Sequence, residues 1–345
     1  MPANLSPEYK AAEAAFRATR EPRERLDCLR EMLRTIPKHK GTEHLQADIK
    51  ARIKDLGEQL EAGRKGGGHG GPALVIRPEG AAQVALLGPP NSGKSALHAR
   101  LTASGATAAP YPFTTQFPQP GMMPHEDIFF QLIDLPPLAA EHPVPWLGSA
   151  LQTADAALLV VDPGEPACTE QLQEVRSLLA ARRVTLTGRW PASDESRGGE
   201  EQGAPADDAD PFGVRLPTLL LANKADLAVD PDVELQALLE LTGLPYPALA
   251  VSAETGRGLG ELGPWLFSRL GVLRVYTKVP GHAVDRQRPF TLRRGQTVGD
   301  VARLVHRDLV RTLRYARIWG PSGFDGQTVG HEHRVADGDV VELHA

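Results

Sequence analysis

One eight-residue stretch constrains the fold of this 345-residue chain more than any other feature. Residues 88–95 read G-P-P-N-S-G-K-S, fit the pattern G-x-x-x-x-G-K-[ST], and directly follow the apolar run 82–87. A strand, a glycine-rich turn and a helix in this order place successive backbone N–H groups and the positive end of the helix around phosphate groups. The stretch therefore predicts a phosphate-binding loop, or P-loop, at the end of a buried strand.

The geometry of such a loop assigns distinct roles to its residues. Lys94 is expected to reach the β- and γ-phosphates of a nucleotide, and the hydroxyl of Ser95 is expected to ligate Mg²⁺. The other residues expected to line the bound phosphates are Gly88, Asn91, Ser92, Gly93 and Ala96.

A second motif indicates which base the nucleotide carries. The apolar run 217–222 predicts another buried strand, and it is followed by Asn223, Lys224 and Asp226, which match N-K-x-D. The Asp226 carboxylate can accept hydrogen bonds from the N1–H and the N2 amine of guanine. Adenine has no such donor pair and would leave the carboxylate unpaired, so the motif predicts preference for guanine. Asn223 is expected to support the loop, and the aliphatic part of Lys224 to cover the base.

A further strand over 247–251 is expected to present Ser252 and Ala253, whose backbone N–H groups are candidates to bond guanine O6. All these motifs follow apolar strands, in an order typical of GTP-binding proteins. We therefore expect an α/β fold: a P-loop GTPase domain built on a doubly wound, mostly parallel sheet.

Between the two motifs lie segments with the positions of nucleotide-dependent switches. The hydroxyl-rich loop 111–117 is a candidate first switch, in which a threonine closes over Mg²⁺ and the γ-phosphate. Asp134 ends the apolar run 127–133, where an acid contacts Mg²⁺ through water. In the usual D-x-x-G pattern the glycine N–H donates to the γ-phosphate, but Pro137 has no N–H. Leu138 also lacks the side-chain amide that orients water in many GTPases.

Composition divides the rest of the chain. Helical spacing over 7–34 and 42–60 predicts an antiparallel helical hairpin, and the polar, acidic stretch 188–211 predicts a disordered insertion. Short strands and a helix with a capping box predict a small α+β domain at the end of the chain. The expected boundaries are 1–62 for the hairpin, 63–72 for a glycine-rich linker, 73–271 for the GTPase domain and 272–345 for the last domain.

Charge is distributed unevenly along the chain. Lys and Arg outnumber Asp and Glu by 14 to 11 over residues 1–65 and by 12 to 8 over 272–345, whereas 66–271 holds 12 basic and 24 acidic residues. Two basic ends around an acidic middle favour contact of the ends with a polyanion such as RNA. An ordinary solvated surface would explain the same numbers.

The sequence indicates no membrane span and no signal peptide, so we expect a cytoplasmic protein that does not bind membranes. Its two cysteines, Cys28 and Cys168, lack the spacing of a disulfide framework or a metal site, which fits a reducing compartment.

As a whole, the chain resembles the developmentally regulated GTP-binding protein (DRG) branch of the Obg-like GTPases. The residues that carry the resemblance are K-G-T-E-H-L at 40–45 with the glycine run after it, Y-P-F-T-T at 111–115, Y-T-K at 276–278, A-R-I-W-G at 316–320 and D-G-D-V at 337–340. The resemblance implies that Thr115 ligates Mg²⁺ and that the C-terminal α+β unit is a TGS domain, a ubiquitin-like β-grasp module.

The resemblance also implies a monomeric enzyme that binds GTP and GDP, hydrolyses GTP, and acts at the ribosome or in translation through its TGS and helical domains. Water would attack the γ-phosphate in line, with Lys94, Thr115 and Asp134 serving the reaction. Because no residue is a convincing water-positioning base, we expect slow turnover that needs a ribosome or a monovalent cation. Asn91 occupies the P-loop position at which K⁺-dependent GTPases carry an asparagine.

Two other functions remain open at this point. Pro137 favours a guanine-nucleotide-binding scaffold that docks on RNA or the ribosome and hydrolyses GTP poorly. A third function, a sensor that holds guanosine tetraphosphate in the GDP site, is also compatible with the motifs.

Overall fold

The computed structural model describes residues 6–19, 22–37, 42–62, 76–102, 117–192, 213–306 and 308–345. The expected linker at 63–72, the first switch loop with Thr115, and most of the insertion predicted at 188–211 lie outside these residues. The described residues fall into two compact units, which are the N-terminal helices and the chain from Arg77 onward. Each unit is treated separately below.

The N-terminal unit contains three helices where the sequence predicts two. They are α1 (Pro7–Ala18), α2 (Pro22–Thr35) and α3 (Glu43–Ala62). The single helix predicted over 7–34 is wrong because proline disfavours the helical conformation in the residue before it and starts a new helix at Pro22. The helices share an apolar core formed by Tyr9, Ala12, Phe16, Leu29, Met32, Ile36 and Ile49.

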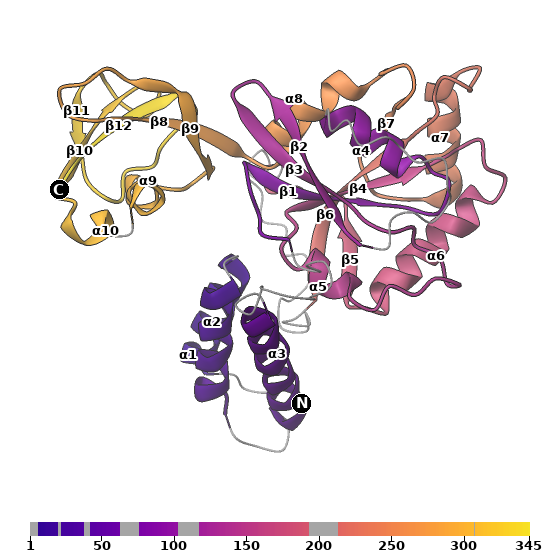
Figure 1. Ribbon diagram of the computed structural model, residues 1–345, viewed down its shortest axis with the longest axis horizontal. Coiled ribbons are helices and arrows are strands. Elements are labelled where there is room, and N and C mark those ends of the chain that lie inside the picture. The colour runs from indigo at the N-terminus through magenta and orange to yellow at the C-terminus, as the bar shows by residue number, and fades with distance from the viewer. Residues whose placement is uncertain are drawn as a thin grey trace. The chain divides into compact units, whose positions relative to one another are not determined.

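The second unit begins with the predicted parallel sheet (Figure 1). Its strands are β1 (Ala82–Leu87), β2 (Gln119–His125), β3 (Ile128–Asp134), β4 (Ala156–Val161), β5 (Val184–Thr187), β6 (Val214–Ala222) and β7 (Ala248–Ala250). The order is β2-β3-β1-β4-β6, and both β5 and β7 pair with the far side of β6. Every pairing is parallel except that of β2 with β3. Every residue of β1 and β4 is buried, as expected for strands covered on both faces.

Helices cover this sheet. Leucines of α4 (Lys94–Thr102) and α8 (Leu259–Arg269) join one apolar core with side chains of β1, β3, β4 and β6. Helices α6 (Cys168–Ala180) and α7 (Pro231–Thr242) contact each other and pack beside β5 and β7, and the short α5 (Leu147–Leu151) precedes β4. Across the described part of the chain, no helix combines the length and the apolar character needed to cross a bilayer.

Strand β2 is not apparent in the sequence. It reads Q-P-G-M-M-P-H, and proline is excluded from central strands because it cannot donate to a neighbour. The strand forms because it lies at the sheet edge, where only β3 pairs with it. It also carries Gly121, at which a Cβ would approach the imidazole of His98 within 2.6 Å, so β2 lies directly against α4.

The beginning of the predicted insertion is well packed rather than disordered. Gly188 to Ala192 are described, and the Trp190 side chain is only 2% exposed within the core of the GTPase domain. Its ring meets that of Trp265 edge-on, with 4.5 Å between the ring centroids. The prediction of disorder from residue 188 is therefore wrong for these five residues, because polar neighbours in the sequence conceal a large aromatic anchor.

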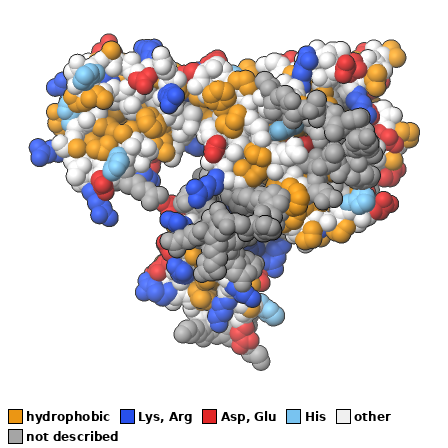
Figure 2. Space-filling view, in the orientation of Figure 1, with side chains coloured by type: hydrophobic (Ala, Val, Ile, Leu, Met, Phe, Trp, Pro, Cys, Tyr) orange, Lys and Arg blue, Asp and Glu red, His pale blue; other side chains and the backbone are white. Residues whose placement is uncertain are grey.

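The C-terminal domain is a five-stranded sheet with helices α9 (Val298–Val305) and α10 (Leu309–Thr312). Its strands are β8 (Val272–Lys278), β9 (Asp285–Arg293), β10 (Tyr315–Trp319), β11 (Gln327–Val329) and β12 (Asp339–His344), in the order β11-β10-β12-β8-β9. Only β12 and β8 are parallel. The predicted capping box of α9, formed by Thr297 and Asp300, is confirmed. Figure 2 shows hydrophobic side chains gathered on the visible face of this domain, with Lys and Arg around them.

We predict that Trp190→Ala destabilises the GTPase domain by about 3–5 kcal/mol, because it removes a buried indole and leaves a cavity. Chemical denaturation followed by circular dichroism measures the loss. The control is Phe324→Ala, whose side chain is 71% exposed and whose removal should change the free energy of unfolding by less than about 0.5 kcal/mol. Equal small effects of the two substitutions would contradict an anchoring role for Trp190.

Candidate nucleotide site

The P-loop joins β1 to α4, and its two glycines are required by close packing. A Cβ on Gly88 would lie 2.2 Å from the carbonyl oxygen of Val160, and a Cβ on Gly93 would lie 2.2 Å from Nδ2 of Asn223. Both glycines have positive φ angles, of 151° and 86°, and Asn91 between them has a φ of 61°. The loop conformation thus depends on residues that tolerate left-handed backbone, as a phosphate-binding turn requires.

Lys94 begins α4 and is 5% exposed. Its Nζ donates a hydrogen bond to the carbonyl of Pro89 at 3.2 Å. Burial lowers the pKa of Lys94 to about 8, and the nearby Asp134 carboxylate opposes this change. The Lys94 ammonium is therefore held inside the loop with few partners. From this position it is expected to reach the phosphates of a nucleotide. Ala96 is the third residue of the same helix.

Ser95 and Asp134 meet at the end of β3. The Ser95 hydroxyl donates to Oδ2 of Asp134 at 2.7 Å, while the buried Oδ1 of Asp134 has no hydrogen-bond partner among the described residues. Burial raises the pKa of Asp134, and the Ser95 hydroxyl, Lys94 and His98 oppose the rise. A hydroxyl beside a carboxylate with one unsatisfied oxygen fits Mg²⁺, which prefers oxygen ligands and keeps several waters. Within the described ranges, no cluster of three or more His, Cys, Asp or Glu side chains could hold a metal by itself.

One buried amide joins the two sequence motifs. The Nδ2 of Asn223, in the loop after β6, donates to the carbonyl of Ser92 in the P-loop at 2.9 Å. Its Oδ1 accepts from the backbone N–H of Ala253, in the loop after β7, at 3.1 Å. Asn223 is 2% exposed, so neither bond is shared with bulk water. The P-loop and the expected base-recognition loop are thereby held at a fixed separation.

The base-recognition residues also lie together, but the two predicted backbone donors already have partners. The Ser252 hydroxyl donates to Oδ1 of Asp226 in a short hydrogen bond and accepts from the N–H of Thr255 at 3.0 Å. Asp226 is therefore oriented by a neighbouring hydroxyl and retains its second oxygen for a ligand. The N–H groups of Ser252 and Ala253, both candidates for guanine O6, already donate to the carbonyl of Arg257 and to Oδ1 of Asn223. A base would therefore have to share these donors.

Asp162, which follows β4, belongs to none of the sequence motifs. Its carboxylate pairs with Nζ of Lys224 at 2.7 Å. Lys224 has a φ of 62°, so the loop is bent sharply where the pair forms. The position of Asp162 in the sequence is a signal for a role at the site, because Asp162, like Asp134, lies at the end of a buried parallel strand. The pair would fix the lysine stem that is expected to cover the base.

A pocket of about 260 Å³ opens beside this pair. Its lining includes Asp162, Asn223, Lys224, Leu227 and Glu234, but neither Asp226 nor any residue of the P-loop. The pocket therefore lies next to the expected base-recognition edge and is separate from the phosphate loop.

The segment after Asp134 is tied to its surroundings by main-chain bonds. The N–H of Leu138 donates to the carbonyl of Gly88 at 3.1 Å, and the N–H of Ala140 donates to the Glu174 carboxylate at 2.6 Å. Leu138 is 2% exposed. With Pro137 lacking an N–H and that of Leu138 already bonded, neither residue has a free main-chain donor for a γ-phosphate.

Comparison with known families gives two matches along the chain. Residues 83–187 match the family described as 50S ribosome-binding GTPase, and residues 273–345 match the TGS domain. The two regions correspond to the P-loop half of the parallel sheet and to the C-terminal sheet.

Whole-chain relatives and one solved structure agree with this division. An uncharacterised GTP-binding protein of Halobacterium salinarum is 30% identical, over 93% of this chain and 98% of its own length. The developmentally-regulated GTP-binding protein 2 homolog of Dictyostelium discoideum is 28% identical, over 92% of this chain and 97% of its own. The YchF GTPase of Schizosaccharomyces pombe has a similar fold, with a TM-score of 0.52 at 14% identity, and the match covers 78% of this chain and all of that one.

We predict that binding of GDP takes up protons at alkaline pH, because phosphate oxygens raise the pKa of Lys94 above its value of about 8 in the free protein. Affinity should be full below pH 8 and fall as the pH rises from there to the pKa in the complex. Calorimetry at about pH 9 in buffers of different ionisation enthalpy measures the uptake. Lys94→Arg is the matched control, since guanidinium stays protonated and should take up none. Equal uptake by both proteins would assign the proton to another group.

Proposed function

Because this chain belongs to the developmentally regulated GTP-binding branch of the Obg-like GTPases and carries a TGS domain, we propose that it hydrolyses GTP to GDP and phosphate. Family membership makes it a GTP-binding protein. The residues that bind the nucleotide, the metal requirement, the reaction rate and the cellular partner are parts of the proposal.

The observation that carries the proposal is the double hydrogen bond of Asn223. Through one buried side chain, the loop expected to hold the phosphates and the loop expected to hold the base share a single support. A ligand that spans both loops must present phosphate at one end and a purine edge at the other. Asp226, with a free carboxylate oxygen beside Ser252, favours guanine over adenine at that edge.

The chain's own residues supply most of what the reaction needs. In our proposal Lys94 moves from the Pro89 carbonyl to the β- and γ-phosphate oxygens and stabilises the charge that develops on them. Ser95 and Asp134 would hold Mg²⁺, Thr115 would complete its ligands, and Asn91 would be the contact for K⁺. Mg²⁺, when bound, neutralises phosphate charge.

Slow intrinsic turnover is part of this proposal. Leu138, at the position where many GTPases have a side-chain amide that orients the attacking water, is apolar and buried. Water would therefore attack in line with little assistance from the protein alone. An activating partner would have to supply a group that orients the attacking water, or hold that water in place.

We further propose that this partner is RNA, most simply the RNA of the ribosome. The protein would bind this RNA as a cytoplasmic monomer. The basic excess of residues 1–65 and 272–345 favours a polyanion, and the matched family is described as ribosome-binding. The two cysteines, both free, suit a reducing compartment.

A second function is favoured by the segment after Asp134. Pro137 has no N–H, and that of Leu138 is bonded to Gly88. A protein without these donors would sense the γ-phosphate weakly and could serve as a guanine-nucleotide-dependent scaffold on RNA, with hydrolysis impaired. The two functions differ in the affinity of the protein for GTP relative to GDP.

We predict that the purified protein hydrolyses GTP at about 10⁻³ per second or slower, the range of GTPases without an assisting arginine, and faster with ribosomes. Asp226→Ala should lower GTP affinity by about 100-fold or more, through loss of two charge-assisted hydrogen bonds, and leave weak ATP binding unchanged. Phosphate release and equilibrium titration measure these effects, with Asp325→Ala as the exposed carboxylate control. Rapid turnover without ribosomes, or equal GTP affinity of the two variants, would contradict the proposal.

If the protein is the scaffold, we predict that Pro137→Gly increases affinity for a non-hydrolysable GTP analogue about tenfold over the wild type, since it restores one N–H to a charged acceptor, while GDP affinity is unchanged. Calorimetry with Mg²⁺ measures both ligands. Pro136→Gly is the matched control, because it adds the same backbone freedom one residue away. This result would favour the scaffold. A wild type that already prefers the analogue, with no gain from Pro137→Gly, would favour the switching enzyme.

A further inference from the structure

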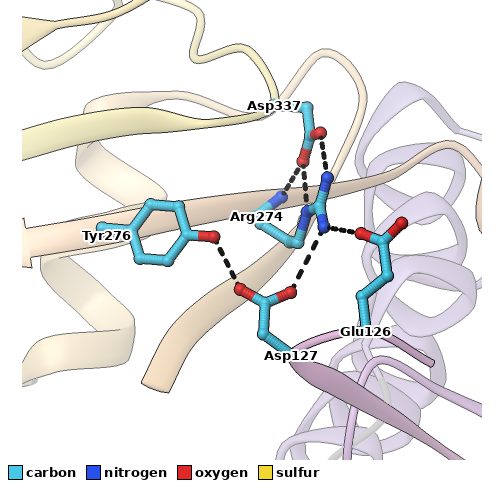
Figure 3. A network of polar contacts seen from close by, with 5 residues as sticks. All are labelled: Glu126, Asp127, Arg274, Tyr276 and Asp337. Carbon is cyan, nitrogen blue, oxygen red and sulfur yellow. Dashed lines mark hydrogen bonds and ion pairs between the residues drawn. The ribbon is translucent and has the colours of Figure 1, made fainter. Parts of the chain in front are cut away.

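Arg274 of β8 lies at the centre of a polar network that joins the C-terminal sheet to the turn between β2 and β3 (Figure 3). Its Nη1 contacts Glu126 and donates to Oδ1 of Asp127 at 3.2 Å. Its Nε and Nη2 bind the two oxygens of Asp337 at 3.1 and 2.8 Å. The hydroxyl of Tyr276 donates to the other oxygen of Asp127 at 2.6 Å. We call these five residues the Arg274 clasp.

The clasp is stronger than a surface ion pair. The Arg274 side chain is 20% exposed and its planar fork meets three carboxylates, one of them through two bonds. The guanidinium also stacks over the ring of Phe267 in α8, 4.9 Å from its centroid. Desolvation raises the pKa of Asp127, but the hydrogen bonds from Tyr276 and Arg274 outweigh it and leave that pKa below its ordinary value. The carboxylate is thus held in its charged form.

The β2–β3 turn contains a residue in an unfavourable backbone conformation. Glu126 and Asp127 form the two-residue connection between β2 and β3, and Glu126 has a φ of 51°. Hairpin turns with a left-handed residue at this position favour glycine or asparagine, and glutamate there is disfavoured. Non-glycine residues in such a conformation concentrate at functional sites. Here the glutamate side chain provides what glycine could not, which is a contact with Arg274.

The turn is also directly connected to the nucleotide site. Strand β3 begins one residue after Asp127 and ends at Asp134, which receives the Ser95 hydroxyl. The seven residues of β3 span about 23 Å as an extended strand. Strand β2, on the other side of the turn, follows directly after the segment that holds Thr115. Both expected switch segments therefore continue into this one hairpin.

A second link fixes the C-terminal domain independently of the turn. The Arg293 guanidinium pairs with the Asp155 carboxylate at 3.3 Å, and Asp155 also accepts from the backbone N–H of Gln83 at 2.8 Å. The N–H of Arg294, directly after β9, donates to the carbonyl of Gly271, directly before β8. Loss of the clasp would then leave the domain attached at its base and through contacts of β9 with β3, while releasing β8 from the β2–β3 turn.

We propose that the Arg274 clasp couples the nucleotide site to the C-terminal domain, so that the ligand at the P-loop sets how tightly β8 holds the β2–β3 turn. The inference rests on the proposed GTP-binding function and adds its regulation. A change at Ser95 and Asp134 on exchange of GDP for GTP shifts β3 along its axis and alters the contacts of Asp127. By thermodynamic linkage, a partner that pulls the C-terminal domain away changes the relative affinity for the two nucleotides by the same factor.

The deciding measurement is the ratio of affinities for a non-hydrolysable GTP analogue and GDP, determined with Mg²⁺ on the full chain. We expect Arg274→Ala to change this ratio by about threefold or more. Arg317→Ala, an exposed arginine on β10 of the same sheet, should leave it unchanged. Hydrogen exchange of residues 272–278 should differ between the two nucleotides in the wild type, and the difference should disappear in Arg274→Ala.

A second variant, on the β2–β3 turn, controls for the case in which Arg274→Ala unfolds the C-terminal domain. Glu126→Gly removes one carboxylate from the clasp and relieves the positive φ, so the ratio should shift in the same direction as in Arg274→Ala without loss of thermal stability. Arg183→Gly relieves the same strain at a φ of 59°, away from the clasp, and should not shift it.

An unchanged ratio in both Arg274→Ala and Glu126→Gly would overturn the inference and leave the clasp a static contact. A wild type that binds no guanine nucleotide would overturn the proposed function, and the coupling with it.

Discussion

The site depends on one constraint, which is that parallel strands buried on both faces must all end at the same edge of their sheet. Strands β1, β3, β4, β6 and β7 are parallel, so the residues that follow them are brought together. Gly88, Asp134, Asp162, Asn223 and Ser252 occupy these ends. The strands themselves are mostly apolar because a polar side chain between two helical layers is costly unless it is hydrogen-bonded. The buried Gln83 of β1 and Gln131 of β3 meet this condition by bonding to each other at 2.9 Å. Polar groups are therefore concentrated where the strands stop.

Several hydrogen bonds and one ion pair reinforce this edge. Asn223 joins two of its loops, Asp162 fixes Lys224, and the Leu138 N–H closes the segment after Asp134 onto Gly88. Such bonds preorganise the site, which lowers the entropy that a ligand must lose on binding. They also restrict movement after Asp134, where many GTPases change conformation. Under our proposal the β2–β3 hairpin carries the change instead, and the C-terminal domain is positioned to receive it.

Local signals in the sequence were sufficient for much of the fold. The apolar runs of β1 and β6 and the capping box of α9 are confirmed because each depends on residues adjacent in the chain. Pro22 is also a local signal, because it begins α2 and separates this helix from α1. Strand β2 and the buried Trp190 were not readable in this way. Their conformations follow from an edge position in the sheet and from packing against Trp265, and neither is encoded within a window of neighbouring residues.

The sequence by itself determined the order of the motifs and the family, because spacing along a chain and the chemistry of glycine, lysine and carboxylate side chains are local properties. It could not determine which polar groups are already bonded to one another. That the Ala253 N–H is taken by Asn223, that the Leu138 N–H is taken by Gly88, and that Glu126 faces Arg274 at a separation of 148 residues were decided by the tertiary structure. Hydrogen bonds between distant segments form only after the sheet has aligned its strand ends and the C-terminal domain has packed beside the hairpin.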